Sequence, residues 1–407
     1  MEFEQHQLPN GIRIIHQHSN RAVAHCGLII NAGSRDEKSE QQGLAHFIEH
    51  VIFKGTKKRK AFHILSRMED VGGEINAFTT KEETCIYSSF MPKYYNRALE
   101  LLQDIAFNST FPAKELKKEK AVVIDEINSY KDNPSEQIFD DFEEQLFDNH
   151  PIGKNILGTP ELVNNFNKSS IKEFIGSHYH SQQMVICSTG NIPFGKLIKW
   201  VDKYFGHLPN SNKESKRKTF ENYNATHKVQ KHNGFQTHCI IGNVAFAANN
   251  PKKTAMILLN NILGGPGMNS RLNLGIREKY GFTYQIESHY TPYSDTGIFN
   301  IYLASDSDKV DKSIKLVKKE LQKLREIPLG PQQIKKAKQQ LIGQIAIAQE
   351  SDINLMLALG KSLLLHNKVD TFEEVKSKIE AVSAEELQEV AKIVFKEEEL
   401  STLIFKN

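Results

Sequence analysis

The pentapeptide at residues 46–50, His-Phe-Ile-Glu-His, holds the side chains of this chain that are best suited to catalysis. Apolar residues flank it on both sides, which predicts a largely buried helix. On a helix His46 and His50 share one face, so their imidazoles could bind one Zn²⁺ at about 2.0–2.1 Å each. Glu49 could then take a proton from a water beside the metal, as amide hydrolysis requires. The alternative is a pair of histidines that are satisfied within a hydrophobic core.

A catalytic zinc site needs a third protein ligand as well as an open position. Residues 119–130, read as a helix, place Glu119 and Glu126 on one largely apolar stripe. Carboxylates on such a stripe are costly unless they are paired or bind a metal. We therefore predict Glu126 as the third ligand, and Glu119 as a residue that hydrogen-bonds a ligand or the site water. A solvated helix face beside neighbouring lysines is the alternative interpretation of this spacing.

These residues and their spacing resemble the pitrilysin/insulinase family of inverted zinc metallopeptidases, which includes the β-subunit of mitochondrial processing peptidase. That family combines His-x-x-Glu-His with a glutamate about 76 residues beyond the second histidine, which is Glu126 here. A further family glutamate seven residues earlier matches Glu119. The resemblance extends over essentially the whole chain. It includes residues 8–11, 72–79 and 270–272, and the pair Arg277 and Tyr284.

The resemblance implies a zinc-dependent endopeptidase that acts on peptides or unfolded segments inside an enclosed chamber. One Zn²⁺ per chain would be held by His46, His50 and Glu126, and Glu49 would be the general base. A non-catalytic scaffold or processing-complex subunit of the same family is the competing hypothesis, although such subunits usually lose part of the metal site. A zinc hydrolase for a small non-peptide substrate is disfavoured by the strand-addition edge described next.

Residues 72–80 read as a turn followed by a strand. In the family this strand is a sheet edge to which the substrate adds as an extra strand. By resemblance, Asn76 and Ala77 contact the substrate near the scissile bond, and Phe78 helps to line a side-chain pocket. An ordinary hairpin strand is the alternative for Phe78.

Residues 270–279 predict a helix that ends at Gly281, and Tyr284 opens the strand that follows. This turn could bring Arg277 and Tyr284 to one side. Arg277 could donate charge-assisted hydrogen bonds to a peptide carbonyl, and Tyr284 could donate to the developing oxyanion. Either residue alone would be an ordinary surface residue, whereas the family pairs them in catalysis.

The resemblance also implies an assembly. In longer single-chain relatives the Arg–Tyr pair comes from the fourth domain and the zinc from the first. Because this chain supplies only half of that arrangement, we expect a homodimer in which Arg277 and Tyr284 face the zinc of the partner chain. A heterodimer with a related subunit is the alternative.

A faint internal repeat indicates how the chain is organised. Residues 24–30 and 237–242 are similar strand-like apolar runs, and each precedes a polar loop and a buried helix. In the second copy, residues 257–261 correspond to the pentapeptide but read Ile-Leu-Leu-Asn-Asn. The second copy has therefore lost the metal ligands.

We predict an α+β fold of two structurally similar domains, each a mixed β-sheet covered by α-helices, as the resemblance also implies. The length of 407 residues agrees with two domains. The expected boundaries are 1–207 for the zinc-binding domain, 208–225 for a polar linker, and 226–407 for the homologous domain without a metal site.

Composition narrows the remaining possibilities. The net charge is only +3, and no basic patch with interleaved aromatic residues predicts nucleic-acid binding. No apolar run reaches transmembrane length, and no signal peptide is recognisable in this numbering. The four cysteines lack Cys-x-x-Cys spacing, which predicts buried free thiols in a reducing compartment. We therefore expect a soluble, cytoplasmic protein.

Overall fold

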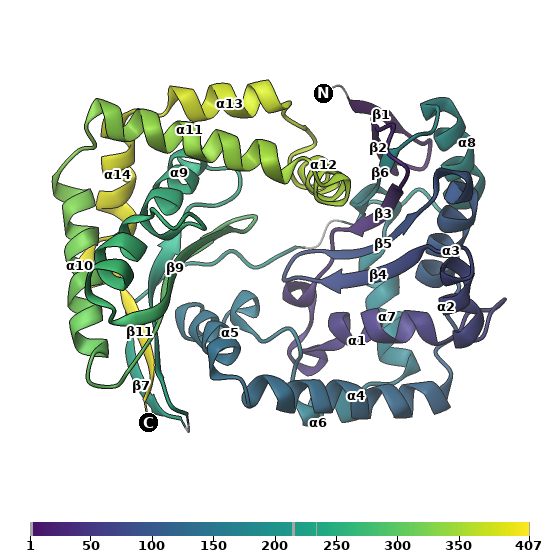
Figure 1. Cartoon of the computed structure of the whole chain (residues 1–407). Helices are drawn as coiled ribbons and strands as arrows, with labels where there is room; N and C mark the ends of the chain where they lie inside the picture. The colour runs from purple at the N-terminus through teal and green to yellow at the C-terminus, as the bar shows by residue number, and fades with distance from the viewer. Residues whose placement is uncertain (1–2, 214–215, 233, 407) are drawn as a thin grey trace. The chain divides into compact units, whose positions relative to one another are not determined.

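Two β-sheets organise the chain (Figure 1). The computed structural model describes residues 3–213, 216–232 and 234–406. Within these residues the chain divides into two units. The first unit consists of residues up to 128, 154–217 and 347–371, and the second consists of residues 129–153, 218–346 and 372 onward.

The first sheet has six strands in the order β1-β2-β6-β3-β5-β4. All neighbours are antiparallel except β2 and β6, which are parallel. The strands are β1 (Phe3–Gln7), β2 (Arg13–His18), β3 (Ala24–Ile30), β4 (Glu74–Thr79), β5 (Thr84–Phe90) and β6 (Met184–Gly190).

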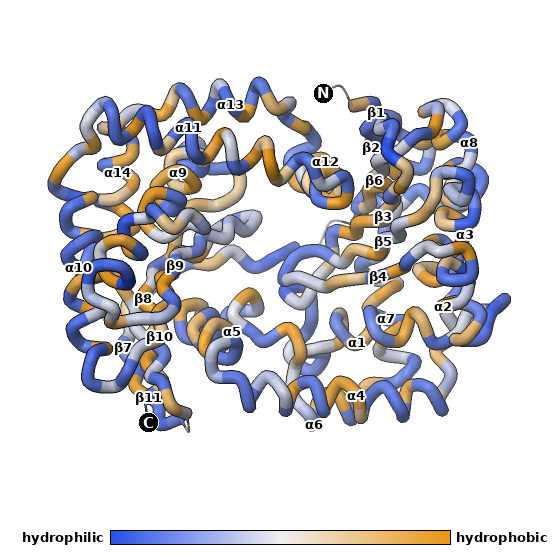
Figure 2. Tube along the Cα trace, in the orientation of Figure 1, coloured by the Kyte–Doolittle hydropathy of each residue, from blue (hydrophilic) through white to orange (hydrophobic). Residues whose placement is uncertain are grey.

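The central strands of this sheet are almost entirely buried, because helices cover both faces. Figure 2 shows that β3 is largely hydrophobic, as expected for a strand that is buried on both faces. One face packs against a core that contains side chains of several helices. These helices are α1 (Leu44–Val51), α2 (Ala61–Glu69), α3 (Tyr95–Phe107), α4 (Ala113–Lys131), α6 (Pro160–Asn165), α7 (Lys168–His178) and α8 (Phe194–Phe205).

The opposite face of the first sheet is covered by a helix from much later in the chain, α12 (Asp352–His366). Met356 of this helix is fully buried against Ile29 and Cys187 of the sheet. Gly360 permits the close approach, because a Cβ atom there would lie 2.6 Å from Ile29 Cδ1 and 2.8 Å from Cys187 Cβ.

The second sheet has five strands in the order β7-β11-β8-β10-β9. Only β7 and β11 are parallel neighbours. This is the pattern of β2-β6-β3-β5-β4 in the first sheet, with β8 in the position of β3. The strands are β7 (His227–Lys231), β8 (Thr237–Ala245), β9 (Thr283–Pro292), β10 (Gly297–Ser305) and β11 (Ser401–Lys406). The predicted repeat of residues 24–30 and 237–242 is therefore a repeat of topology, and the predicted fold class is confirmed.

Helices cover both faces of the second sheet as well. One face packs against α9 (Lys253–Gly264), α10 (Val310–Glu326) and α14 (Ala384–Val394), with α11 (Pro331–Ala348) and α13 (Phe372–Ala381) beside them. The other face packs against α5 (Pro134–Leu146), whose Phe142 is fully buried in a cluster with Ile240 and Phe405 of the sheet.

The two units exchange helices relative to the expected domains. Helix α5 lies in the first half of the sequence but in the second unit, and α12 lies in the second half but in the first unit. The boundaries 1–207, 208–225 and 226–407 therefore do not describe the units at these two helices. The physical reason is that each sheet needs a helix on its second face, and the chain supplies it from the other half. Residues 214–215 of the expected linker lie outside the described residues.

Two smaller expectations concern the cysteines and the membrane. The four cysteines are buried free thiols, as predicted; they are Cys26, Cys85, Cys187 and Cys239. Among the residues that the structure describes, no helix combines the length and apolar character needed to cross a bilayer.

Candidate metal centre

The pentapeptide lies on α1, a helix whose start is fixed by a buried carboxylate. Gly43 precedes the helix in a left-handed conformation, with φ of 93°. The Glu37 carboxylate accepts hydrogen bonds from the backbone N–H groups of Gly43 (2.8 Å) and Ala45 (2.7 Å). These bonds satisfy donors that a helix start otherwise leaves free. Burial raises the pKa of the Glu37 carboxyl well above its usual value.

Helix α4 brings a third group to the two histidines of α1. The Nε2 atom of His46 lies 3.7 Å from Oε1 of Glu126, and the Nε2 atom of His50 lies 3.4 Å from Oε2 of Glu126. The two imidazole ring centroids are 4.7 Å apart. These three residues form a cluster in which one potential ligand atom from each lies within 4.8 Å of the others.

The cluster fits the donor set and dimensions of a zinc site. Two ligands bound to Zn²⁺ at about 2.0–2.1 Å in tetrahedral geometry lie about 3.3–3.4 Å apart. The separations of Glu126 from the two imidazoles are close to this value. Nδ1 of His46 is buried and has no hydrogen-bond partner among the described residues. The Nε2 atoms of both rings face the Glu126 carboxylate, so the three groups could share one cation.

The protonation states also suit a metal. Burial lowers the pKa of His46 to about 4, so the imidazole is neutral at physiological pH. A hydrogen bond from His50 lowers the pKa of Glu126 and keeps it a carboxylate. Two imidazoles and one carboxylate are the protein ligands found in several catalytic zinc enzymes.

Glu49 is outside this cluster of three and is held by a different contact. Thr79, the last residue of β4, donates a hydrogen bond of 2.6 Å from its hydroxyl to Oε2 of Glu49. Burial raises the pKa of Glu49, while the Thr79 hydrogen bond acts in the opposite direction. A carboxylate with a raised pKa is better matched to proton transfer near neutral pH.

Glu119 lies on the same helix as Glu126 and is buried next to His50. Its Oε2 atom is 3.9 Å from Nδ1 of His50, and its Oε1 atom is 2.9 Å from Nζ of Lys54. Glu119 thus faces the second nitrogen of a histidine whose first nitrogen faces Glu126. The sequence predicts that Glu119 hydrogen-bonds a metal ligand or the site water, and at a separation of 3.9 Å from His50 this role stays a prediction.

Strand β4 is the terminal strand of the first sheet, and among the described residues it pairs with β5 alone. Asn76 is exposed, and its side-chain oxygen accepts a hydrogen bond of 2.9 Å from the N–H of Ala77. Ala77 packs toward the core that contains α1. Phe78 points to the opposite face, where its ring lies 6.2 Å from that of Tyr87. The side chains of successive residues of β4 therefore point to opposite faces of the sheet.

Arg277 and Tyr284 lie in the second unit, whereas the metal-ligand cluster lies in the first. The predicted helix around Arg277 contains a π-helical turn, η7 (Asn273–Glu278), and it ends at Gly281 in a left-handed conformation, with φ of 63°. Arg277 is exposed and donates a hydrogen bond of 3.4 Å to Oδ1 of Asn273. Tyr284, on β9, is 85% exposed. Both side chains are accessible for contacts beyond this unit.

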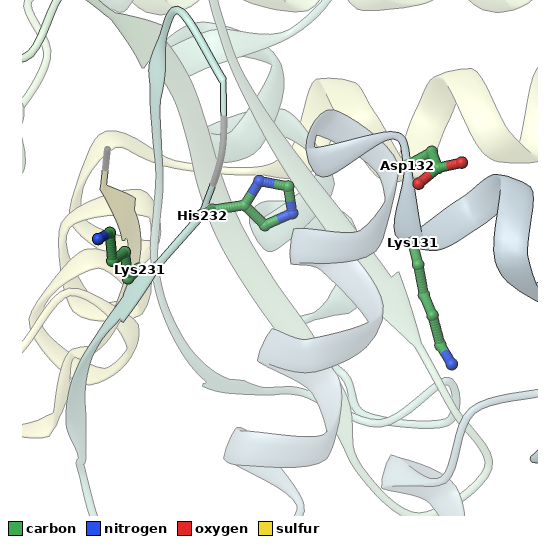
Figure 3. Close-up of a pocket in the computed structure, with 4 residues that line it drawn as sticks. All are labelled: Lys131, Asp132, Lys231 and His232. Atoms are coloured by element: carbon green, nitrogen blue, oxygen red, sulfur yellow. The ribbon is translucent and has the colours of Figure 1, made fainter.

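The second unit offers no comparable metal cluster among its described residues. Its helix α9 follows β8 as α1 follows β3, and it carries Asn260 and Asn261 where α1 carries Glu49 and His50. A hollow of about 610 Å³ in this unit is lined by Lys131, Asp132, Lys231 and His232. Figure 3 shows that these four side chains do not converge on one point. One carboxylate and one imidazole are too few ligands for a catalytic zinc.

Three residues that hold this site were not identified from the sequence: Glu37, Lys54 and Thr79. Glu37 lies six positions before Gly43, outside the spacing of a capping box, so no local pattern reveals it. Thr79 and Lys54 reach their partners across 30 and 65 positions of sequence. Only the tertiary fold brings these pairs together.

Comparisons with known proteins identify the family of the chain. A family model described as insulinase (peptidase family M16) matches residues 13–160, which include α1 and Glu126. A second, described as the peptidase M16 inactive domain, matches residues 165–341. The absence of a metal cluster from the described part of the second unit is in keeping with that description.

Similar proteins cover nearly the same length. The chain is 33% identical over 399 residues to an uncharacterized zinc protease of Bacillus subtilis, with 97% of this chain and 96% of that protein covered. It is 31% identical over 407 residues to an uncharacterized zinc protease of Rickettsia bellii, with 100% and 98% covered.

Two solved structures share the fold. One is a protease from Helicobacter pylori, with a TM-score of 0.93, 21% identity, and coverage of 100% of this chain and 99% of that chain. The other is described as a peptidase M16 inactive domain from Pseudomonas fluorescens, with a TM-score of 0.92, 19% identity, and coverage of 100% and 98%. At these identities the likeness speaks for the fold alone.

Proposed function

The chain belongs to peptidase family M16, the insulinase family, and we propose on this premise that it is a zinc-dependent endopeptidase. The observation that carries the proposal is the cluster of His46, His50 and Glu126. Its donor set and separations fit one Zn²⁺ per chain. Relatives that align over nearly the whole chain bear the name zinc protease.

His46, His50 and Glu126 would hold the metal, and the remaining groups would act on the substrate. Zinc, when bound, supplies a Lewis acid that polarises the scissile carbonyl and lowers the pKa of a water to about 7. Glu49 accepts a proton from the attacking water and later delivers it to the leaving amine. Thr79 holds Glu49 in place through its 2.6 Å hydrogen bond.

The substrate would be a peptide or an unfolded segment. In the described part of the chain no strand pairs with β4 on the side away from β5, and β4 ends at the residue that binds Glu49. A peptide added along this edge gains backbone hydrogen bonds and lies next to the base. Asn76 and Ala77 would contact it near the scissile bond, and Phe78 with Tyr87 would line a pocket for a side chain. Most segments of a folded protein are held in its own structure and would not lie extended along this edge.

Arg277 and Tyr284 would bind the substrate carbonyl and stabilise the tetrahedral state from a partner chain. We propose a homodimer, because one sequence carries both the zinc residues and the Arg–Tyr pair. Complementation tests this arrangement: a Glu49→Gln chain mixed with an Arg277→Ala, Tyr284→Ala chain should regain activity. Demonstrated subunit exchange without activity would refute the trans arrangement. A heterodimer with a related subunit would instead show as a homogeneous monomer of the isolated chain.

The four buried free thiols are compatible with a reducing compartment, and we propose a cytoplasmic location. Fractionation of cells that express the tagged chain would test this.

The function is tested by digestion of a mixed peptide library, read by mass spectrometry. The purified protein should cleave the library, lose this activity with a zinc chelator, and regain it when zinc is restored. A matched folded protein should resist cleavage under the same conditions. Zinc binding without cleavage of any peptide would instead favour a non-catalytic subunit.

A further inference from the structure

Lys54 occupies a place between the two metal-binding helices that the proposed mechanism does not use. It ends η3 (Ile52–Lys54), the short turn that continues α1 after His50. Its Nζ atom lies 2.9 Å from Oε1 of Glu119 on α4. The Lys54 side chain is 31% exposed, whereas that of Glu119 is only 7% exposed. The ammonium therefore reaches inward from the surface to a buried carboxylate.

A buried carboxylate needs a partner, because desolvation favours its neutral form. Oε2 of Glu119 points toward Nδ1 of His50 at 3.9 Å, and Oε1 binds Lys54. The two oxygens thus have separate partners, one in the metal centre and one outside it. With Lys54 holding one oxygen of Glu119, the other oxygen stays directed at the imidazole of His50.

The orientation of His50 follows from this contact. Its Nε2 atom faces Glu126 in the metal-ligand cluster, and its Nδ1 atom faces Glu119. When a metal occupies Nε2, the ring proton lies on Nδ1, which is the nitrogen that faces the Glu119 carboxylate. His46 differs, since its Nδ1 has no hydrogen-bond partner among the described residues. The cluster therefore has one supported imidazole and one that depends on packing.

We propose that Lys54 is a positioning residue of the metal centre, which holds the Glu119 carboxylate against His50 and thereby strengthens zinc binding. Lys54 acts through Glu119 and does not touch the metal. This inference rests on the proposed function, because it presupposes zinc at His50. Such outer contacts typically change metal affinity by about 10–100-fold.

The test is a thermodynamic cycle on zinc affinity, measured by competition with a chromogenic chelator. Lys54→Met and Glu119→Gln should each weaken zinc binding by about tenfold or more. The double variant should bind zinc about as tightly as Glu119→Gln alone, because Lys54 has no effect once the carboxylate is removed. Lys54→Arg should retain most of the affinity, since a guanidinium also pairs with a carboxylate.

Lys58→Met is the matched control, because Lys58 is an exposed lysine four residues away. Its zinc affinity should equal that of the wild type. Thermal melts of the zinc-free proteins establish that each variant is folded, and the double variant avoids an unpaired buried carboxylate. A Lys54→Met protein with wild-type zinc affinity would overturn this inference alone. Wild-type protein that binds no zinc would overturn both this inference and the proposed function.

Discussion

The two sheets share one strand pattern, yet the described residues hold a metal-ligand cluster only on the first. In each unit a helix follows the third strand of the pattern, α1 after β3 and α9 after β8. The first carries Glu49 and His50, and the second carries Asn260 and Asn261 at the corresponding positions. The frame is therefore compatible with both sequences, and the chemistry depends on a few side chains.

The helices that cover these sheets are also arranged alike, whether or not the unit has a metal cluster. Each sheet is closed on its second face by a helix from the other half of the sequence, α12 for the first and α5 for the second. In both units a helix buries the second face of the sheet, although a metal cluster is found in the described part of only one unit. Substitutions at corresponding positions can separate what the frame needs from what the metal centre needs.

The largest expected effect on activity comes from replacing Glu49 of α1, and the matched control is Asn260 of α9. Glu49→Gln should lower the rate of peptide cleavage by about 10²–10⁴, because a positioned general base is lost. Its zinc content should be unchanged, since Glu49 is outside the metal-ligand cluster. Asn260→Ala, at the corresponding position of α9, should leave the cleavage rate near that of the wild type. Equal losses in both variants would show that the two helices do not differ in catalysis.

Core substitutions should affect the two units alike. Phe142→Ala on α5 should lower the free energy of unfolding by about 3–5 kcal/mol, and Met356→Ala on α12 by about 2–5 kcal/mol. Both side chains are fully buried against the second face of a sheet. Denaturant unfolding of the two variants measures this. A change below about 1 kcal/mol in either would mean that the helix is not required by its sheet.

Acid should weaken the first unit through its buried histidines. Burial lowers the pKa of both His16 and His46 to about 4. Between about pH 6.5 and about pH 4 the unfolded chain binds protons at these residues that the folded chain does not. The metal-free protein should therefore lose stability as pH falls through this window, by about 3 kcal/mol for each histidine.

The unfolding free energy of His16→Leu should fall less steeply across the same window. His16 is fully buried and stacks on Phe194, with ring centroids 6.1 Å apart, so leucine preserves an apolar contact there. An unchanged slope in this variant would show that His16 does not contribute to acid sensitivity.

The smallest expected effect comes from removing the hydrogen bond that Thr79 donates to Glu49. Thr79→Val removes the hydroxyl that donates to Glu49 and keeps the shape of the side chain. We expect kcat to fall by about 10- to 100-fold with little change in KM, since a charged hydrogen bond contributes about 1.5–3 kcal/mol. Thr79→Ser retains the hydroxyl and should stay close to the wild-type rate. If both variants lose activity equally, packing at Thr79 matters and its hydrogen bond does not.

Much of the fold could be predicted from patterns that are local in sequence. The apolar runs 24–30 and 237–242 and the helices after them identified the repeat, because strand and helix periodicity are local properties. The exchange of α5 and α12 could not be predicted. The hydrophobic residues of α12 indicate that it is buried, but they do not specify which sheet covers it.

In the candidate site, too, the features that are local in sequence could be predicted and the contacts between separate elements could not. His46 and His50 are predicted together by their spacing on one helix, and Glu126 by its place on an apolar stripe and by family resemblance. The structure brings these three residues together. The contacts of Thr79 with Glu49 and of Lys54 with Glu119 join separate elements, so no periodicity within one element reveals them.

The most direct test of the central claim is the zinc content of the purified protein after removal of loosely bound metal. The wild type should carry about one zinc per chain, because the three residues of the cluster would fill three positions of a catalytic zinc and leave the fourth open. Glu126→Gln should carry much less, whereas Asn261→Ala, at the position that corresponds to His50 in the second unit, should match the wild type. Undiminished zinc in Glu126→Gln would contradict the assignment of the metal to this cluster.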